Sequence, residues 1–112
     1  MTKMIDIAKD FSPYPAGRYN DDGPFSGEKF RDEYLRPVLE SGEKAVINLD
    51  GARGYGSSFL EEAFGGLVRA GFSPERIKKS FTLETADDSL IFEIEDYIEH
   101  GDEPDSGMSL PS

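Results

Sequence analysis

The stretch that decides the fold reads Lys44-Ala-Val-Ile-Asn-Leu-Asp-Gly-Ala-Arg-Gly-Tyr-Gly-Ser-Ser-Phe-Leu-Glu-Glu-Ala-Phe-Gly-Gly-Leu-Val68. Its first six residues have a continuous apolar centre, which predicts a strand in the interior of a sheet. A glycine-rich turn follows. Large apolar side chains then recur at helical spacing up to Val68, which predicts a helix pressed against that sheet.

The flanking sequence extends this alternation of strand and helix. Two further strands and three further helices are predicted, at residues 4–8, 81–85, 26–41, 74–79 and 88–100. Ser26, Ser73 and Asp87 or Asp88 are candidate caps for these helices. Pro37 lies inside the first helical pattern and predicts a bend or an end there.

The alternation predicts a small, single α/β domain with a central, mostly parallel or mixed sheet of about four strands and helices packed on it. We assign residues 1–101 to this domain and residues 102–112 to a flexible acidic tail. Residues 11–25 contain too many prolines and glycines for regular structure, so we expect a long loop that contains at most a short hairpin. Its aromatic side chains are expected to hold the loop against the body, namely Phe11, Tyr14, Tyr19 and Phe25.

The chain has 112 residues, with 12 Lys and Arg against 23 Asp and Glu, and a formal net charge of −11. Residues 1–83 carry 13 acidic and 12 basic side chains, whereas residues 84–112 carry ten acidic side chains and no lysine or arginine. This acidic quarter disfavours binding to nucleic acid or to an anionic membrane. No apolar stretch is long enough for a membrane span or a signal peptide, so we expect a cytoplasmic protein.

Cysteine is absent, and His100 is the only histidine. Disulfides, thiolate metal sites and sites with several histidines are therefore excluded, and we expect no metal and no cofactor. The glycines at 51, 54 and 56 do not have the G-x-G-x-x-G spacing, and no P-loop is present, which argues against direct nucleotide binding.

The turn from Asp50 to Ser58 is the candidate functional site, because ligands collect where a strand of an α/β sheet leads into a helix. Ser58 with Glu61 fits a capping box, in which the serine is only an N-cap. The same serine could instead accept a phosphate, whose negative charge suits a helix start. In the long loop, Arg18 could pair with an acid or reach a phosphate at this turn. The glycine pair at 65–66 indicates close packing inside the protein or against a partner.

Residues 47–68, together with Gly17-Arg18 and the segment Ser26-Gly27-Glu28-x-Phe30-Arg31, resemble the STAS-like domain-of-unknown-function family. That family is similar to the STAS domains of anti-sigma-factor antagonists. The resemblance implies a serine phosphorylated by a histidine-kinase-like ATPase, with Ser58 as the phosphoacceptor and Ser57 as its neighbour. This chain departs from the antagonist pattern, since Gly56 precedes the serines and Phe59 follows them.

The leading hypothesis is a non-enzymatic regulatory module that binds a protein partner and is switched by serine phosphorylation. The expected partner-binding residues are Asp50, Arg53, Tyr55, Phe59 and Glu62. The alternative is a small acidic inhibitor of the phage or mobile-element type, which mimics nucleic acid and binds a basic protein surface. For the chain itself we expect a bacterial or phage origin. A hydrolytic enzyme that uses the serines is the third reading, but the only histidine lies some forty residues away. The sequence does not define the oligomeric state.

Overall fold

The computed structural model describes residues 2–102, and its centre is a sheet of three strands. The strands are β1 (Thr2–Asp6), β2 (Lys44–Asn48) and β3 (Phe81–Glu84), in the order β1-β2-β3. Both neighbouring pairs are parallel. The prediction of about four strands is therefore corrected to three within the described residues, because the remaining apolar segments are helical. The predicted tail from residue 103 onward lies outside the described residues.

Two long helices connect the strands. The first consists of α1 (Gly27–Phe30), the π-helical turn η3 (Arg31–Leu35) and α2 (Arg36–Ser41), which follow one another without a break. The second consists of α3 (Ser57–Leu60), the π-helical turn η4 (Glu61–Gly65) and α4 (Gly66–Arg69). The remaining elements are η1 (Ile7–Phe11), η2 (Asn20–Asp22), α5 (Pro74–Ser80) and α6 (Asp88–Glu99).

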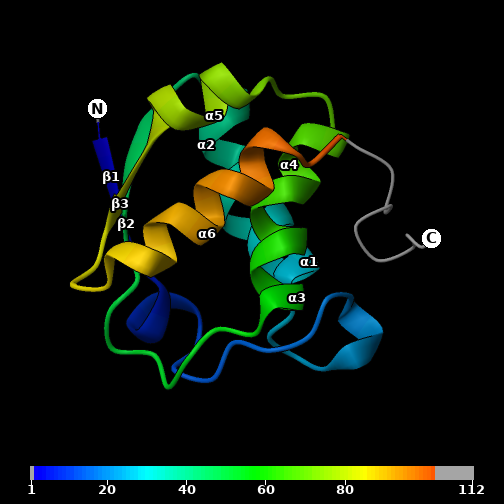
Figure 1. Ribbon diagram of the computed structural model, residues 1–112, viewed down its shortest axis with the longest axis vertical. Helices are drawn as coiled ribbons and strands as arrows, with labels where there is room; N and C mark the ends of the chain where they lie inside the picture. Colours follow the sequence, from blue (N-terminus) through cyan, green and yellow to red (C-terminus); the bar gives the residue numbers. More distant parts are fainter. Residues whose placement is uncertain (1, 103–112) are drawn as a thin grey trace.

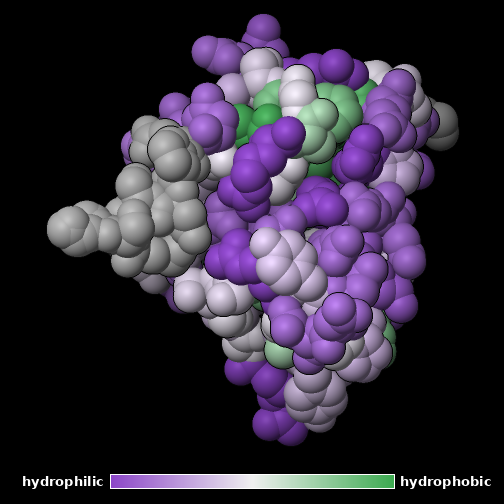
Figure 2. Space-filling view, turned by 90° about the vertical axis from the view of Figure 1, so that its right-hand side faces the viewer, coloured by the Kyte–Doolittle hydropathy of each residue, from purple (hydrophilic) through white to green (hydrophobic). Residues whose placement is uncertain are grey.

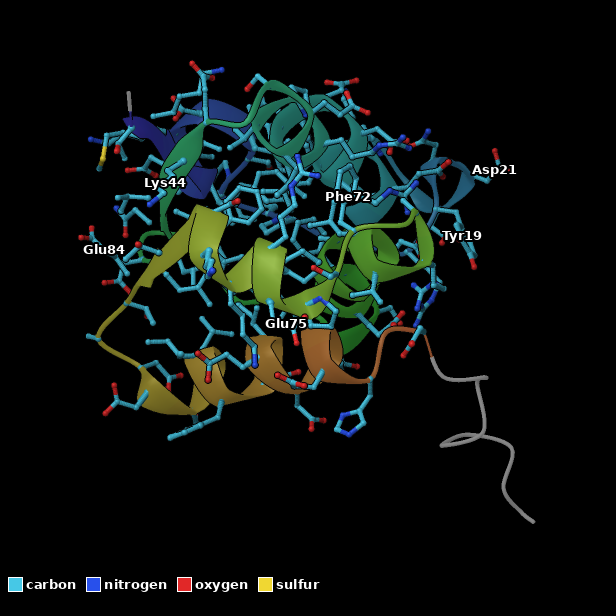
Figure 3. All side chains as sticks on the ribbon, turned by 90° about the horizontal axis from the view of Figure 1, so that it is seen from above. Tyr19, Asp21, Lys44, Phe72, Glu75 and Glu84 are labelled. Carbon is cyan, nitrogen blue, oxygen red and sulfur yellow. The ribbon has the colours of Figure 1, made fainter. Side chains whose placement is uncertain are left out.

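All of the labelled helices lie on one side of the sheet (Figure 1). The two crossover connections, from β1 to β2 and from β2 to β3, advance across the sheet in the same direction. Since such connections are right-handed, both place their helices on the same face of the sheet. The core follows from this arrangement, because Ile5, Ile47 and Leu83 occupy matching register positions that face the helices. On the other face, Lys44 and Glu84 project away from the helical layer (Figure 3).

Local signals in the sequence account for most of the helix boundaries. Ser26, Ser73 and Asp87 each accept a hydrogen bond from a backbone N–H in the first turn of the following helix, as predicted. Pro37 does not end its helix, which continues to Ser41. The wider π-helical turn η3 immediately precedes the proline and accommodates its missing N–H and its ring.

The segment at 12–25 contains a 3-10 turn, η2, and no hairpin. Phe11 and Phe25 anchor it as predicted, with their ring centroids 5.6 Å apart in an edge-to-face arrangement. Tyr14 and Tyr19 do not, because they are 59% and 53% exposed. Their phenol rings occupy the surface, where the hydroxyl groups stay in water.

Candidate functional site

The start of α1 is closed by hydrogen bonds. The backbone N–H groups of Gly27 and Glu28 donate to the carbonyl oxygens of Gly17 and Arg18, over 2.9 and 3.0 Å. The third N–H, that of Lys29, donates to the Ser26 hydroxyl over 3.1 Å. Every N–H group that this first turn would otherwise leave free is therefore paired within the protein.

The start of α3 is open by comparison. Its N-cap is Gly56, which has no side chain to accept a hydrogen bond, so Ser57 and Ser58 are the first two helical residues. The prediction that Ser58 is the N-cap of a capping box with Glu61 is therefore wrong, since the helix starts earlier than the Ser-x-x-Glu pattern indicates. Among the described residues, the N–H groups of Ser57, Ser58 and Phe59 have no hydrogen-bond acceptor.

Both serines are exposed, but their surroundings differ. The hydroxyl of Ser57 lies close enough to the Tyr97 phenol of α6 to affect its titration. Burial, and then a 2.7 Å hydrogen bond from Tyr97 to Glu93, raise the pKa of this phenol to about 12, while Ser57 acts in the opposite direction. Ser58 has no such neighbour among the described residues, so its hydroxyl is the freer of the two.

Three arginines from different parts of the chain converge on the next turn of the same helix. Arg18 from the loop and Arg69 from α4 both pair with Glu61 and Glu62, and Arg31 from η3 pairs with Glu62. The Glu62 side chain is only 8% exposed, whereas that of Arg18 is 27% exposed. The cluster thus ties the long loop and both long helices to one buried carboxylate.

The pKa values of this cluster follow from its pairing. Burial by itself raises the pKa of Glu61, but hydrogen bonds from Arg69 and Arg18 outweigh burial and hold it below its ordinary value. Burial also disfavours the charged form of Arg18 and by itself lowers its pKa. The bonds of Arg18 to Glu61 and Glu62 outweigh burial and raise this pKa above its ordinary value. Glu61 therefore stays ionised through the physiological range, and the cluster stays intact.

The turn before α3 is held by short contacts at both of its ends. The side chain of Asp50 accepts a hydrogen bond from the Thr85 hydroxyl over 2.7 Å, which ties the turn to the end of β3. The Tyr55 hydroxyl donates to the carbonyl oxygen of Leu49 over 2.5 Å. Burial, aided by nearby carboxylates, raises the pKa of this phenol well above its ordinary range.

Arg53 lies at the exposed tip of this turn. Its N–H donates to the carbonyl oxygen of Pro13 over 2.8 Å, and its guanidinium lies 5.6 Å from the centre of the Tyr14 ring. The turn and the long loop thus meet at one surface, where the largely exposed Tyr14 ring contacts Arg53.

Two residues predicted to bind a partner lie in the interior. The Phe59 ring is fully buried, between Phe30, Phe11 and Tyr55. Glu62 is buried and held by the arginines. Neither side chain is available at the surface, so we keep only Asp50, Arg53 and Tyr55 of the predicted set.

Sequence reasoning missed Arg31, Arg69 and Tyr97 as parts of this region. The sequence pattern places Arg31 and Arg69 on helix faces that are expected to be exposed to solvent. Only the packing of the two helices against each other brings these arginines to Glu62. The glycine pair at 65–66 was the available signal. An added methyl group at Gly66 would meet the Arg31 side chain, and one at Gly65 would meet Glu61 and the Tyr97 carbonyl oxygen. The pair thus serves packing inside the protein.

Figure 2 shows the side of the molecule to the right in Figure 1, where hydrophilic residues predominate and hydrophobic ones gather toward the top. Within residues 2–102, no group of three or more histidine, aspartate and glutamate side chains is arranged to hold a metal ion. No helix in the same range is both long enough and apolar enough to cross a membrane.

Comparison with known families matches residues 26–90 of the chain to a family described as "STAS-like domain of unknown function (DUF4325)". The matched range runs from the cap of α1 to the first turn of α6 and includes the open start of α3. No curated protein and no solved structure matches the chain.

Proposed function

This chain belongs to the family of STAS-like domains of unknown function, and from that premise we propose that it is a non-enzymatic regulatory module that binds a protein partner. The partner surface consists of the Asp50–Ser58 turn, the open start of α3 and the adjoining Tyr14. Phosphorylation of Ser58 switches this surface. We expect a protein with this role in the cytoplasm.

The observation that carries the proposal is the open start of α3. A helix start with unpaired N–H groups and a partial positive charge favours an anion. Ser58 is exposed in the first turn, and a phosphate on it adds about two negative charges with three strong acceptor oxygens. The open helix start at Ser58 therefore suits a phosphate, whereas the closed start of α1 does not.

Arg18 gives the switch a structural consequence. Arg18 and Arg69 each bind both Glu61 and Glu62, and Arg18 is the one that belongs to the long loop. A phosphate one helical turn away competes with Glu61 for this guanidinium. Because the Arg18 carbonyl oxygen also closes the start of α1, displacing Arg18 changes the loop that contacts Arg53.

The proposal is tested with phosphoserine incorporated at position 58, compared with Ser58→Ala and with the same modification at Ser57. We expect phosphoserine 58 to alter hydrogen exchange in residues 12–25 and to lower the affinity for a histidine-kinase-like ATPase domain at least tenfold. Phosphoserine 57 serves as the matched control at the adjacent position. If phosphoserine 58 leaves both loop exchange and binding unchanged in a folded protein, the switch is refuted.

A salt titration of the complex with a partner tests the nucleic-acid-mimic hypothesis. Residues 84–102 contain eight acidic side chains and no lysine or arginine. A complex built on that charge weakens steeply as salt rises, because exposed charges are screened over about 8 Å at physiological ionic strength. A complex built on the start of α3 retains most of its affinity in the same titration.

A further inference from the structure

We propose a second interaction surface, at which an extended basic segment of a partner protein adds as a strand to the free edge of β3. The surface is a groove of about 250 Å³ between β3, α5 and α6. Its lining includes Lys78, Phe81, Thr82, Leu83, Ile91 and Glu95. This groove lies apart from the start of α3, so the inference goes beyond the function proposed above.

The backbone of β3 supplies the first element of the argument. The N–H of Leu49 donates to the carbonyl oxygen of Glu84 over 2.9 Å, so Glu84 directs its backbone toward β2. Alternate residues of a strand direct their polar groups to opposite sides, so Leu83 directs its N–H and its carbonyl oxygen to the free edge. In the described part of the chain, no strand follows β3 on that side. An edge of this kind is a template for another strand.

The opposite edge of the sheet is blocked at the end of β1. The N–H of Asp6, at the end of β1, donates to the side chain of Asp10 over 2.8 Å. The π-helical turn η1 follows β1 directly and brings Asp10 to this edge. The two edges of the sheet therefore differ at this end, and the groove lies at the edge of β3.

The helix α6 lies across the groove from β3. It packs mainly against η4 and α5, and its residues Ile91, Glu95 and Ile98 line the side of the groove opposite the strand. Pockets for small molecules usually measure about 300–1,000 Å³, so this smaller groove suits the side chains of a peptide. β3 has four residues and is about 13 Å long, which matches a segment of four to six residues.

The two faces of β3 define the sequence of the segment. Phe81 and Leu83 point to the helix side of the sheet, whereas Thr82 and Glu84 are exposed, and Thr82 borders the groove at the strand edge. Side chains of an added strand alternate in the same way, one set into the groove and the other set beside Thr82 and Glu84. The partner segment therefore alternates apolar and polar residues.

Charge then specifies the polar residues. The side-chain carboxylates of Glu84 and Glu95 have no hydrogen bond or ion pair with any described residue, and Lys78 is already paired with Glu99. Glu95 lines the groove, whereas Glu84 lies on the exposed face beside the free edge, so lysine or arginine at the polar positions of the segment complements Glu84. An acidic segment of the same pattern is repelled.

The test uses a capped hexapeptide, Lys-Val-Arg-Ile-Lys-Val, with the intact protein. We expect saturable binding at concentrations up to about 1 mM, at least tenfold slower hydrogen exchange of the Leu83 amide, and weaker binding as salt rises. Two matched peptides separate the contributions. Replacing every basic residue by glutamate removes the charge match, and N-methylation of alternate peptide bonds removes the strand hydrogen bonds. Each change is expected to weaken binding at least tenfold.

Two variants locate the site. Ile91→Lys places a charge of the peptide's own sign in the groove and should abolish binding of the basic peptide. Phe92→Ser is the matched control on the same helix, because Phe92 is 71% exposed and does not line the groove. The proposal is overturned if the basic peptide does not bind, if the glutamate or N-methylated peptide binds equally well, or if folded Ile91→Lys protein binds the basic peptide unchanged.

Discussion

The two long helices begin in opposite ways. At the start of α1, Ser26 and two carbonyl oxygens of the long loop accept all three N–H groups of the first turn. At the start of α3, Gly56 caps without a side chain, and the two serines that follow are exposed. The same residue type, serine before a helical pattern, thus closes one helix start and leaves the other available. A serine at a helix start is therefore identified as a cap by its position relative to the first helical residue.

The two helices are also joined to each other, through Arg31 and Glu62. Replacing Glu62 by Gln leaves the Arg31 guanidinium, which is only 14% exposed, without its buried counter-charge. Breaking a buried pair in this way costs roughly 3–5 kcal/mol, and we expect a loss of about 3 kcal/mol in the free energy of unfolding. Urea denaturation measures the loss.

The matched control is Glu95→Gln, which removes the same charge from a carboxylate that has no cation partner among the described residues. A surface change of this kind alters stability by less than about 0.5 kcal/mol. Equal effects for the two substitutions would show that the arginine cluster does not join the helices.

Gly27 tests the contact between the two helix starts. An added methyl group there would overlap the carbonyl oxygen of Phe59, which is backbone and cannot rotate away. We expect Gly27→Ala to lower the free energy of unfolding by about 1–3 kcal/mol despite the better helix propensity of alanine. Thermal and urea denaturation both measure this.

Gly56→Ala is the control for Gly27. Gly56 has a φ of −69°, which any residue adopts, and beyond its chain neighbours no atom lies within 4 Å of the position of an added methyl group. Stability should stay the same or rise by a few tenths of a kcal/mol. A loss at Gly56 as large as at Gly27 would contradict the description of the α3 start as open.

Sequence reasoning was most successful where a local interaction determines the structure. The apolar centre of Lys44–Asn48 and the serine caps at 26 and 73 follow from neighbouring residues. It was less successful where distant residues meet. No periodicity in the sequence places Arg18 and Arg69 on Glu61, because that contact depends on how a loop and a helix end approach a third element.

The family resemblance indicated a region and a residue to test, but not the geometry around them. It directed attention to the turn before α3, and the family match covers that turn. The predicted surface also included Phe59 and Glu62, although both are interior. Apolar and acidic residues in a first helical turn look alike in sequence whether they face a partner or the core, and the neighbouring helix decides between the two.

The smallest expected effects concern the serines themselves. Ser26→Ala removes the acceptor for the Lys29 N–H, so we expect a loss of about 1 kcal/mol, as is usual for an N-cap. Ser58→Ala removes a hydroxyl that accepts no hydrogen bond from the described residues, so stability should change by less than about 0.5 kcal/mol. Urea denaturation of the two variants side by side makes the measurement. If Ser58→Ala were as costly as Ser26→Ala, Ser58 would be a cap after all, and its hydroxyl would not be free to accept a phosphate.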